Sequence, residues 1–411
     1  METEAAAGTR RLGRWRRDGR WKIAFGLLGV ALAIPLWAQQ SRVYRDGDAW
    51  VEEVSGTLPP CRQLHVTTDS GSVQVQGNSP RVIWVVRKRS YAATEAAARK
   101  DFARLRVSAV KNGEIAVIGG KLAPKSLIRF NTEFFLKVPQ DVQLVKAETR
   151  SGGLSFITLA GSILGTTTGG LVKLDNLSGP VKISSGGGPI EAGNLGSDLT
   201  IVSGGGVIHI NSVAGAARVH IDGGAVFIGS ARTVDVQTGA GGIEIRKCLG
   251  DLHVSTGGGN VVLGDVNGTV EAETTGGSVR LSSAAGRVQV ATGGGSVQLF
   301  RLNHGAQVEN GAGPIAVEFL NAAGFTDSLL RTASGDITVI MPGGMPVTVH
   351  ASTDMANGQG IMARDFPGLR VTSEGGKVGP RSMFAEGTLN GGGPMLRVRT
   401  TMGQIEFRRS Q

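Results

Sequence analysis

Several signals that identify common protein classes are scarce or missing in this chain. Only 2 of its 411 residues are cysteine, and Cys61 and Cys248 do not have the spacing of a metal site or a redox pair. We therefore expect Cys248 to be a small buried side chain. Glycine is abundant but follows no strict three-residue period, which excludes a collagen-like chain. Disorder is excluded too, because valine, isoleucine and leucine alternate regularly through the glycine-rich region.

Glycine pairs, by contrast, recur at a regular step. Between about Thr149 and about Phe319 the step is about 17 to 19 residues, close to the shortest periods known for stacked-coil architectures. The pairs are Gly152-Gly153, Gly169-Gly170, Gly186-Gly187, Gly204-Gly205, Gly223-Gly224, Gly241-Gly242, Gly257-Gly258, Gly276-Gly277 and Gly293-Gly294. Each coil of such a repeat buries itself only against its neighbours, so we expect one continuous body.

Within each repeat, apolar and polar residues alternate on both sides of a bend. Val172, Leu174, Val181 and Ile183 have the spacing of inward-facing strand residues, and the residues between them face outward. The sequence predicts an all-β fold, a single-stranded β-helix (β-solenoid) with about 17–19 residues per coil. One short N-terminal helix and a transmembrane anchor helix complete the predicted fold.

The N-terminus has the composition of a targeting segment. Seven basic residues in a predicted cytoplasmic tail, 1–22, precede an apolar run over 23–38. The run is short for a membrane span, yet long for the core of a cleaved signal peptide. We favour a retained transmembrane anchor over a signal cleaved after Ala38, and we expect a polar linker over 39–53. Arg10-Arg11 fits a twin-arginine signal poorly and is interpreted as topogenic charge.

Beyond this segment the sequence divides into three parts. An N-terminal capping part of the solenoid is expected over 54–148, and three- and four-residue apolar steps predict a helix between Ser90 and Leu105 that caps the first coil. Regular repeats are expected over 149–319. Irregular C-terminal coils and a cap follow over 320–411, and we expect the final glycine-rich block to close the stack.

The formal charge of +10 raises the question of nucleic-acid binding. The basic surplus lies partly in the N-terminal tail and partly between Arg81 and Arg150, while the repeats mix both signs. A phosphate-binding surface needs a concentrated basic face. We therefore expect no nucleic-acid partner.

The repeats resemble a known family. Thr-x-Gly-Gly-x-Val-x-Leu recurs, an entry element lies at Phe135-Leu136-Lys137-Val138-Pro139, and closing elements lie at 389–394 and 401–405. These motifs are similar to those of the bacterial toastrack, or candidate-adhesin, family of β-strand-repeat proteins. The resemblance implies a single-stranded β-helix outside the cytoplasmic membrane, in proteins linked to adhesion or to envelope-stress signalling. Family members share no agreed catalytic residues, so the resemblance implies none here.

Three further motifs bear on possible binding or catalytic chemistry. Ser185-Gly186-Gly187-Gly188 precedes a strand, whereas a phosphate cradle precedes a helix. The recurring glycine-aspartate nonapeptide of calcium-binding β-rolls is missing from the sequence. The strongest catalytic candidates, as in β-helix enzymes that cleave acidic polysaccharides, are Asp235, His253, Glu271 and Glu273. Comparable outward positions hold Lys182, Thr200, Gln289 and Gln307, which indicates an ordinary solvated face.

Aromatic and histidine residues give weaker signals. Phe227 and Phe300 have no evident aromatic neighbour one coil away, so a stacked sugar-binding platform is not predicted. His209 and His220 belong to one repeat and raise the possibility of a shared metal, although surface histidines on strands are the preferred interpretation.

The sequence thus predicts a non-enzymatic, envelope-exposed β-solenoid that acts as an adhesin-like display or scaffold surface. We expect no catalytic, cofactor-binding or metal-binding residues. The expected partners are the membrane, through the N-terminal helix, and an envelope protein or glycan. The expected location is the cytoplasmic membrane, single-pass with the C-terminal domain outside, or a cleaved and secreted form. The alternatives are a polysaccharide-active β-helix enzyme and an envelope-stress sensing module.

Overall fold

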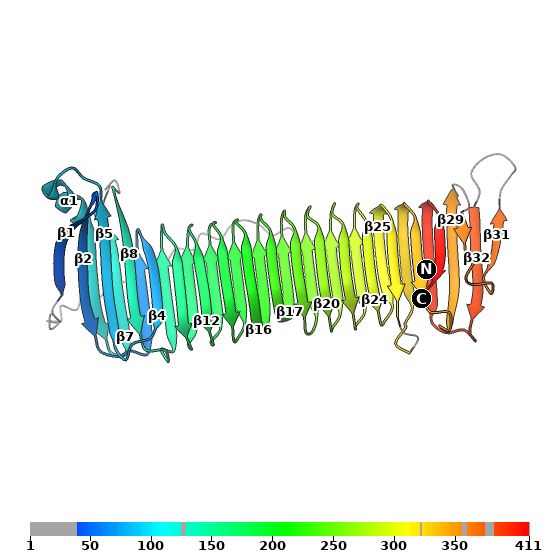
Figure 1. Cartoon of the computed structure of the whole chain (residues 1–411), viewed down its shortest axis with the longest axis horizontal. Helices are drawn as coiled ribbons and strands as arrows, with labels where there is room; N and C mark the ends of the chain where they lie inside the picture. The colour runs from blue at the N-terminus through cyan, green and yellow to red at the C-terminus, as the bar shows by residue number, and fades with distance from the viewer. Residues whose placement is uncertain (1–38, 125–128, 321–322, 356–359, 375–381, 411) are drawn as a thin grey trace, which may run out of the picture. The chain divides into compact units, whose positions relative to one another are not determined.

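The computed structural model describes residues 39–124, 129–320, 323–355, 360–374 and 382–410 (Figure 1). The tail predicted over 1–22 and the anchor predicted over 23–38 lie outside this part of the chain. Among the described residues, no helix has the length and apolar character needed to cross a membrane. The described residues form a β-solenoid of about 11 turns, which confirms the predicted all-β class.

Each regular coil contributes one strand to each of two sheets, called here the first and second sheet. The first sheet contains β10 (Leu154–Leu159), β12 (Val172–Leu177), β14 (Ile190–Leu195), the start of β16 (Ile208–Ile221), the start of β17 (Val226–Thr238), β18 (Ile243–Cys248), β20 (Val261–Val266), β22 (Val279–Ala284), β24 (Val297–Leu302), β26 (Ile315–Phe319) and β28 (Ile337–Met341). The second contains β9 (Leu144–Thr149), β11 (Ser162–Thr167), β13 (Val181–Ser185), β15 (Leu199–Ser203), the ends of β16 and β17, β19 (Leu252–Thr256), β21 (Val270–Thr274), β23 (Val288–Thr292), β25 (Ala306–Ala312) and β27 (Ser328–Ser334).

Neighbouring coils pair in parallel and in register. Val172 pairs with Ile190, and Ile190 pairs with Ile208, so equivalent positions lie 18 residues apart. The inward-facing aliphatics predicted from the alternation are buried; Val172, Leu174 and Ile183 are each 0% exposed. Each such side chain contributes about 1.5–3 kcal/mol when fully buried. The regular step therefore stacks the aliphatics into continuous internal columns.

A second column consists of buried hydroxyl groups at the end of the second-sheet strand. Thr256, Thr274 and Thr292 are each at most 6% exposed and occupy the same register position in successive coils. Each hydroxyl donates to a glycine carbonyl of the preceding coil, as Thr274 does to Gly259 at 3.0 Å. These side chains satisfy backbone groups at the tight corners, where strand pairing ends.

The N-terminal end begins earlier than the sequence predicted. The polar stretch over 39–53, expected to be a linker, contains β1 (Gln40–Asp46) and the start of β2 (Ala49–Leu58). The expectation failed because the charges that suggested a linker lie on the outer face. Glu53 there accepts from Arg42 at 2.7 Å and from Arg87 at 3.0 Å, while Ala49 and Val51 are buried on the inner side.

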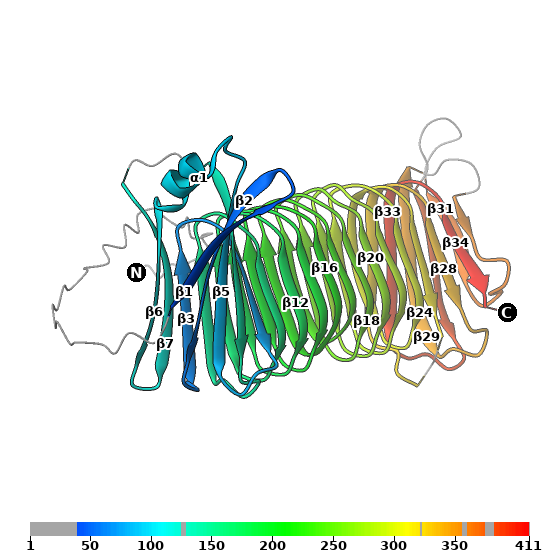
Figure 2. The ribbon, with the colours of Figure 1, turned by 60° about the vertical axis from the view of Figure 1, so that its left-hand side comes forward.

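The remaining N-terminal elements are β3 (Gln63–Thr68), β4 (Ser72–Gly77), β5 (Val82–Ser90), α1 (Glu95–Phe102), β6 (Leu105–Asn112), β7 (Ile115–Leu122) and β8 (Phe130–Val138). The β3–β4 coil pairs with β9 and β10 on one side and with β7 and β8 on the other. Helix α1 lies inside the range predicted for it. Thr94 accepts from the Ala97 amide at 3.3 Å to cap its N-terminus. Figure 2 shows α1 at this end of the solenoid, beside β2.

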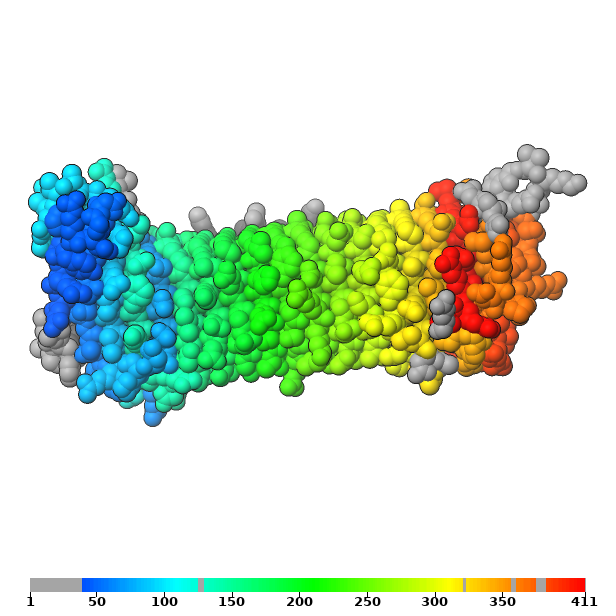
Figure 3. Space-filling model, viewed as in Figure 1, coloured from blue at the N-terminus to red at the C-terminus, as the bar shows by residue number. Residues whose placement is uncertain are grey.

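The C-terminal elements are β29 (Val347–Met355), β30 (Ile361–Met362), β31 (Arg370–Glu374), β32 (Ser382–Leu389), β33 (Met395–Met402) and β34 (Ile405–Arg409). The final block was expected to close the stack, but it does not. Instead β33 lies between β27 and β29, and β34 lies between β28 and β30 (Figures 1 and 3). This coil keeps the repeat's corner chemistry, since Thr400 donates to Gly335 at 2.9 Å, so it stacks directly on the regular coils.

Candidate functional site

The predicted catalytic candidates lie together on the outer face of the second sheet. Asp235 pairs with His253, and His253 pairs with Glu271, so the three occupy one row across β17, β19 and β21. Glu273 lies two residues beyond Glu271 and faces the same side. The Nδ1 atom of His253 is 3.1 Å from a carboxylate oxygen of Glu271.

The same row extends in both directions through other polar residues. Its members in register are Lys182, Thr200, Arg218, Asp235, His253, Glu271, Gln289 and Gln307. The coils that carry the row follow one another at 17 residues, from Arg218 to Asp235, or at 18, from Asp235 to His253 and from His253 to Glu271. These coils therefore contain no insertion beside the row. Within the described part of the chain, the candidates therefore lie on an open strand face without flanking loops.

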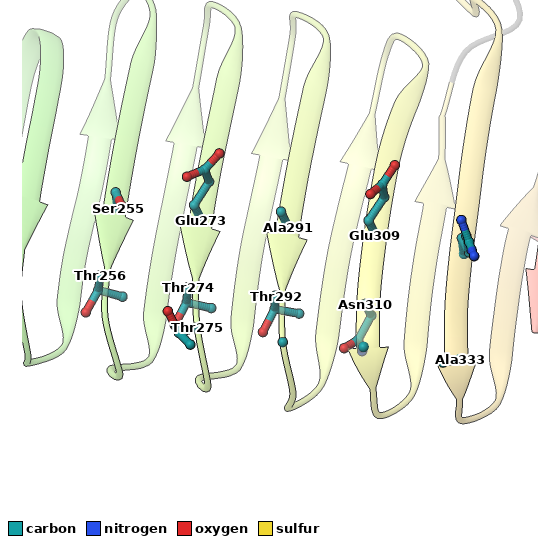
Figure 4. Close-up of a pocket in the computed structure, with 13 residues that line it drawn as sticks. Ser255, Thr256, Glu273, Thr274, Thr275, Ala291, Thr292, Glu309, Asn310 and Ala333 are labelled. Atoms are coloured by element: carbon teal, nitrogen blue, oxygen red, sulfur yellow. The ribbon is translucent and has the colours of Figure 1, made fainter. Parts of the chain in front are cut away.

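A shallow hollow of about 540 Å³ lies on this face, next to the row (Figure 4). Glu273 and Glu309 line it from β21 and β25, and Ala291 of β23 lies between them in register. Because the alanine is short, the two carboxylates border an open depression. Strand spacing puts them about 9–10 Å apart.

The sequence analysis missed Glu309. It lies two coils beyond Glu273, and stepping by the repeat length through Ala291 would have found it. The hollow is also lined by Ser255, Thr274 and Arg331. With hydroxyls, carboxylates and one guanidinium on an open face, it can hydrogen-bond a hydroxyl-rich ligand, but it has no wall to exclude water from a reaction.

The histidine pair does not form a metal site. His209 lies in the first-sheet part of β16, whereas His220 lies in its second-sheet part, so the two side chains project from different sheets. Across the described residues, no three His, Cys, Asp or Glu side chains gather closely enough to hold a metal ion.

Aromatic contacts are more developed than the sequence suggested. His209 stacks on Phe227 of the next coil, with ring centroids 5.3 Å apart and an interplanar angle of 27°. The expectation that Phe227 lacks an aromatic neighbour one coil away was therefore wrong. Phe300 instead contacts the Arg280 guanidinium, which lies over the ring at 5.3 Å from its centroid.

Both cysteines are free and buried. Burial raises the pKa of the Cys248 thiol, whose sulfur lies 3.3 Å from the carbonyl oxygen of Gly250. Burial likewise raises the pKa of the Cys61 thiol. A thiol with a raised pKa is a poor nucleophile at neutral pH. The geometry agrees with the interpretation of Cys248 as a packing residue.

The glycine run after Ser185 forms a corner between two strands. The Ser185 hydroxyl donates to the Gly187 carbonyl at 2.8 Å, and the chain continues into strand β14. The amides of this run therefore do not open a helix, as a phosphate cradle requires.

Residues 61–359, more than two thirds of the chain, match the family model described as Toastrack DUF4097. The chain belongs to the Toastrack DUF4097 family. The toastrack resemblance inferred from the glycine-pair motifs is thus confirmed. No curated protein matches the sequence.

The solved structures that match this toastrack chain include the following three. A candidate cell adhesion protein from Clostridium sporogenes is 9% identical, with 88% of this chain and 100% of that chain covered and a TM-score of 0.18. A candidate lipid binding protein from Parabacteroides distasonis is 13% identical, with coverages of 72% and 97% and a TM-score of 0.23. A candidate adhesin from the same species is 9% identical, with coverages of 72% and 98% and a TM-score of 0.25. These values do not support the transfer of a ligand.

Proposed function

We propose that this toastrack chain is a non-enzymatic display surface of adhesin type, exposed at the cell envelope. The observation that carries the proposal is the regular parallel stacking of the coils at 17 or 18 residues over most of the repeats. Inward positions are occupied mainly by aliphatics that hold the stack together. Outward positions on the open faces hold varied side chains, mostly polar but including the exposed Leu164, Val202 and Val262. Such a surface contacts a partner through its outer rows without any need for a closed pocket.

The N-terminal segment supplies the proposed location. A basic segment followed by an apolar run favours an anchor in the cytoplasmic membrane, with the solenoid outside. N-terminal sequencing of the exported protein tests this proposal. An intact N-terminus supports the anchor, and a start at Gln39 indicates a cleaved and secreted form.

One pair of measurements distinguishes a binding surface from an enzyme. The full chain is incubated with acidic and neutral polysaccharides; release of reducing ends reports cleavage, and retention on immobilised envelope glycans and proteins reports binding. We expect retention without cleavage. Release of reducing ends that is lost in both Glu271→Gln and Glu273→Gln would overturn the non-enzymatic proposal.

A further inference from the structure

A groove of about 380 Å³ crosses the outer face of the second sheet where the C-terminal coil is inserted. It is lined by β27, β33, β29 and β32, and it is called here the C-terminal groove. Its lining includes Leu329, Arg331, His350, Phe384, Arg397 and Arg399. Four strands that lie between Ser328 and Met402 therefore meet in one site.

The insertion of β33 places two guanidiniums directly opposite one another and a third opposite an imidazole. Arg331 of β27 pairs in register with Arg399 of β33, and Arg397 pairs with His350 of β29. Arg397 and Arg399 are two residues apart on one strand and face the same side. Like charges directly opposite each other in a sheet are destabilising. Glu309 of β25 lies in register with Arg331 on the other side and offsets part of this repulsion. A bound anion would offset the remainder.

Only part of this charge is compensated within the protein. Arg399 is 3.1 Å from a carboxylate oxygen of Asp354, and His350 is 3.4 Å from one of Glu386. The side chains of Arg331 and Arg397 are exposed, and their guanidiniums make no hydrogen bond or ion pair with any described residue. Two guanidiniums on neighbouring strands are consequently available for a ligand. Guanidinium groups bind carboxylates through two parallel hydrogen bonds.

The uncharged part of the groove suits a sugar. Phe384 is half-buried and offers an aromatic surface, and Ser352, its register partner, adds a hydroxyl. The carboxylates of Glu386 and Asp354 beside the cations can accept hydrogen bonds from ligand hydroxyls. They would repel an anionic chain more strongly the denser its charge, and a phosphodiester chain carries one charge per 3.4 Å of strand. The groove therefore suits a ligand whose negative charges are well separated along the chain and accompanied by hydroxyl groups.

We propose that the C-terminal groove binds an anionic polysaccharide. Arg331 and Arg397 hold its carboxylates, and Phe384 packs against a sugar ring. The proposal deepens the display function and rests on it, since it gives that surface a place and a ligand class.

The test measures binding of fluorescently labelled polygalacturonate to the full chain by fluorescence anisotropy. Arg331→Ala combined with Arg397→Ala should weaken binding at least about tenfold, because each lost charge-assisted contact is worth about that factor. The matched control combines Arg106→Ala and Arg287→Ala. It removes two exposed arginines without ion pairs among the described residues, at the other end and in the middle of the solenoid. Circular dichroism verifies that both variants remain folded.

Three results would overturn the proposal. These are equal binding by the two double variants, equal binding of neutral dextran, and tighter binding of duplex DNA than of polygalacturonate. The display function is tested separately from the groove. If the full chain retains other envelope components and the groove variant does so equally well, the groove is excluded and display stands. If no envelope component is retained, display itself is excluded.

Discussion

The ammonium group of Lys88 lies 2.8 Å from a carboxylate oxygen of Glu52, beneath helix α1. Lys88 is 4% exposed and also donates to the carbonyls of Phe102 and Leu105, at 3.0 and 2.8 Å. All three of its donors are therefore used: one by Glu52, one by the carbonyl of Phe102 at the C-terminal end of the helix, where a cation is favourable, and one by the carbonyl of Leu105 at the start of β6. One buried side chain connects strands β2 and β5 to the capping helix.

Lys88→Met should destabilise the N-terminal cap by about 3 kcal/mol, because it leaves Glu52 unpaired in a largely buried position. Hydrogen exchange of the α1 amides measures this effect locally, and the exchange should be faster in the variant. The control is Arg89→Met at the next position, where an exposed arginine pairs with Asp46 at 2.7 Å and is worth at most about 1 kcal/mol. Equal protection of α1 in the two variants would contradict the assigned role.

Adjacent glycines at one corner differ in what surrounds them. A Cβ on Gly277 would overlap the Gly259 carbonyl of the preceding coil, whereas a Cβ on Gly276 would have no atom within 4 Å. Gly277→Ala should therefore lower stability by about 1–3 kcal/mol, since backbone cannot move aside without disturbing the stack. Gly276→Ala should be nearly neutral. Thermal unfolding of the two variants measures the difference, and similar melting temperatures would refute this explanation.

The hydroxyl column gives a further test at Thr292. Its Oγ1 lies 3.0 Å from the Gly277 carbonyl oxygen and 2.6 Å from that of Gly294. Thr292→Val keeps the shape but removes the donor, so we expect a loss of about 1–2 kcal/mol in the free energy of unfolding. Thr200→Val, on the outer face, should change stability by less than about 0.5 kcal/mol. Urea titration of both variants measures this; a neutral Thr292→Val would indicate that water replaces the bond.

Glu53 gives a pH dependence whose sign is fixed by its surroundings. Burial raises the pKa of this carboxyl, but the hydrogen bonds and charges of Arg87 and Arg42 outweigh burial and hold the pKa below its ordinary value. A pKa lowered in the folded state stabilises the fold above the unfolded value of about 4.3. That contribution is lost as the pH falls through the folded pKa.

Melting temperatures measured from neutral to acid pH should thus decline less steeply for Glu53→Gln than for the unmodified chain. The combination of Arg42→Ala and Arg87→Ala should flatten the profile in the same way, because it removes the cause of the shift. Parallel acid profiles for all three proteins would rule out this linkage.

The sequence by itself determined the repeated part of this protein. The repeat step follows from the recurring glycine pairs, and the inward position of residues such as Val172 and Ile183 follows from local alternation. The helix before Leu105 follows from apolar steps of three and four residues. These features are predictable because each coil pairs only with its neighbours, and a fixed step places equivalent residues opposite one another. The row of Asp235, His253 and Glu271 was predictable for the same reason.

Tertiary structure alone decided the two ends. Strand β1 and the start of β2 looked like a linker because their sequence is rich in charge, and Glu53 there is paired both by Arg42 of the adjacent strand β1 and by Arg87 of the more distant strand β5. Arg331 meets Arg399 because β33, from near the C-terminus, inserts beside β27. At an end the order of strands depends on which exposed edges pair, a competition between segments far apart in sequence. No local alternation records its outcome, which is why the C-terminal groove is visible only in the folded chain.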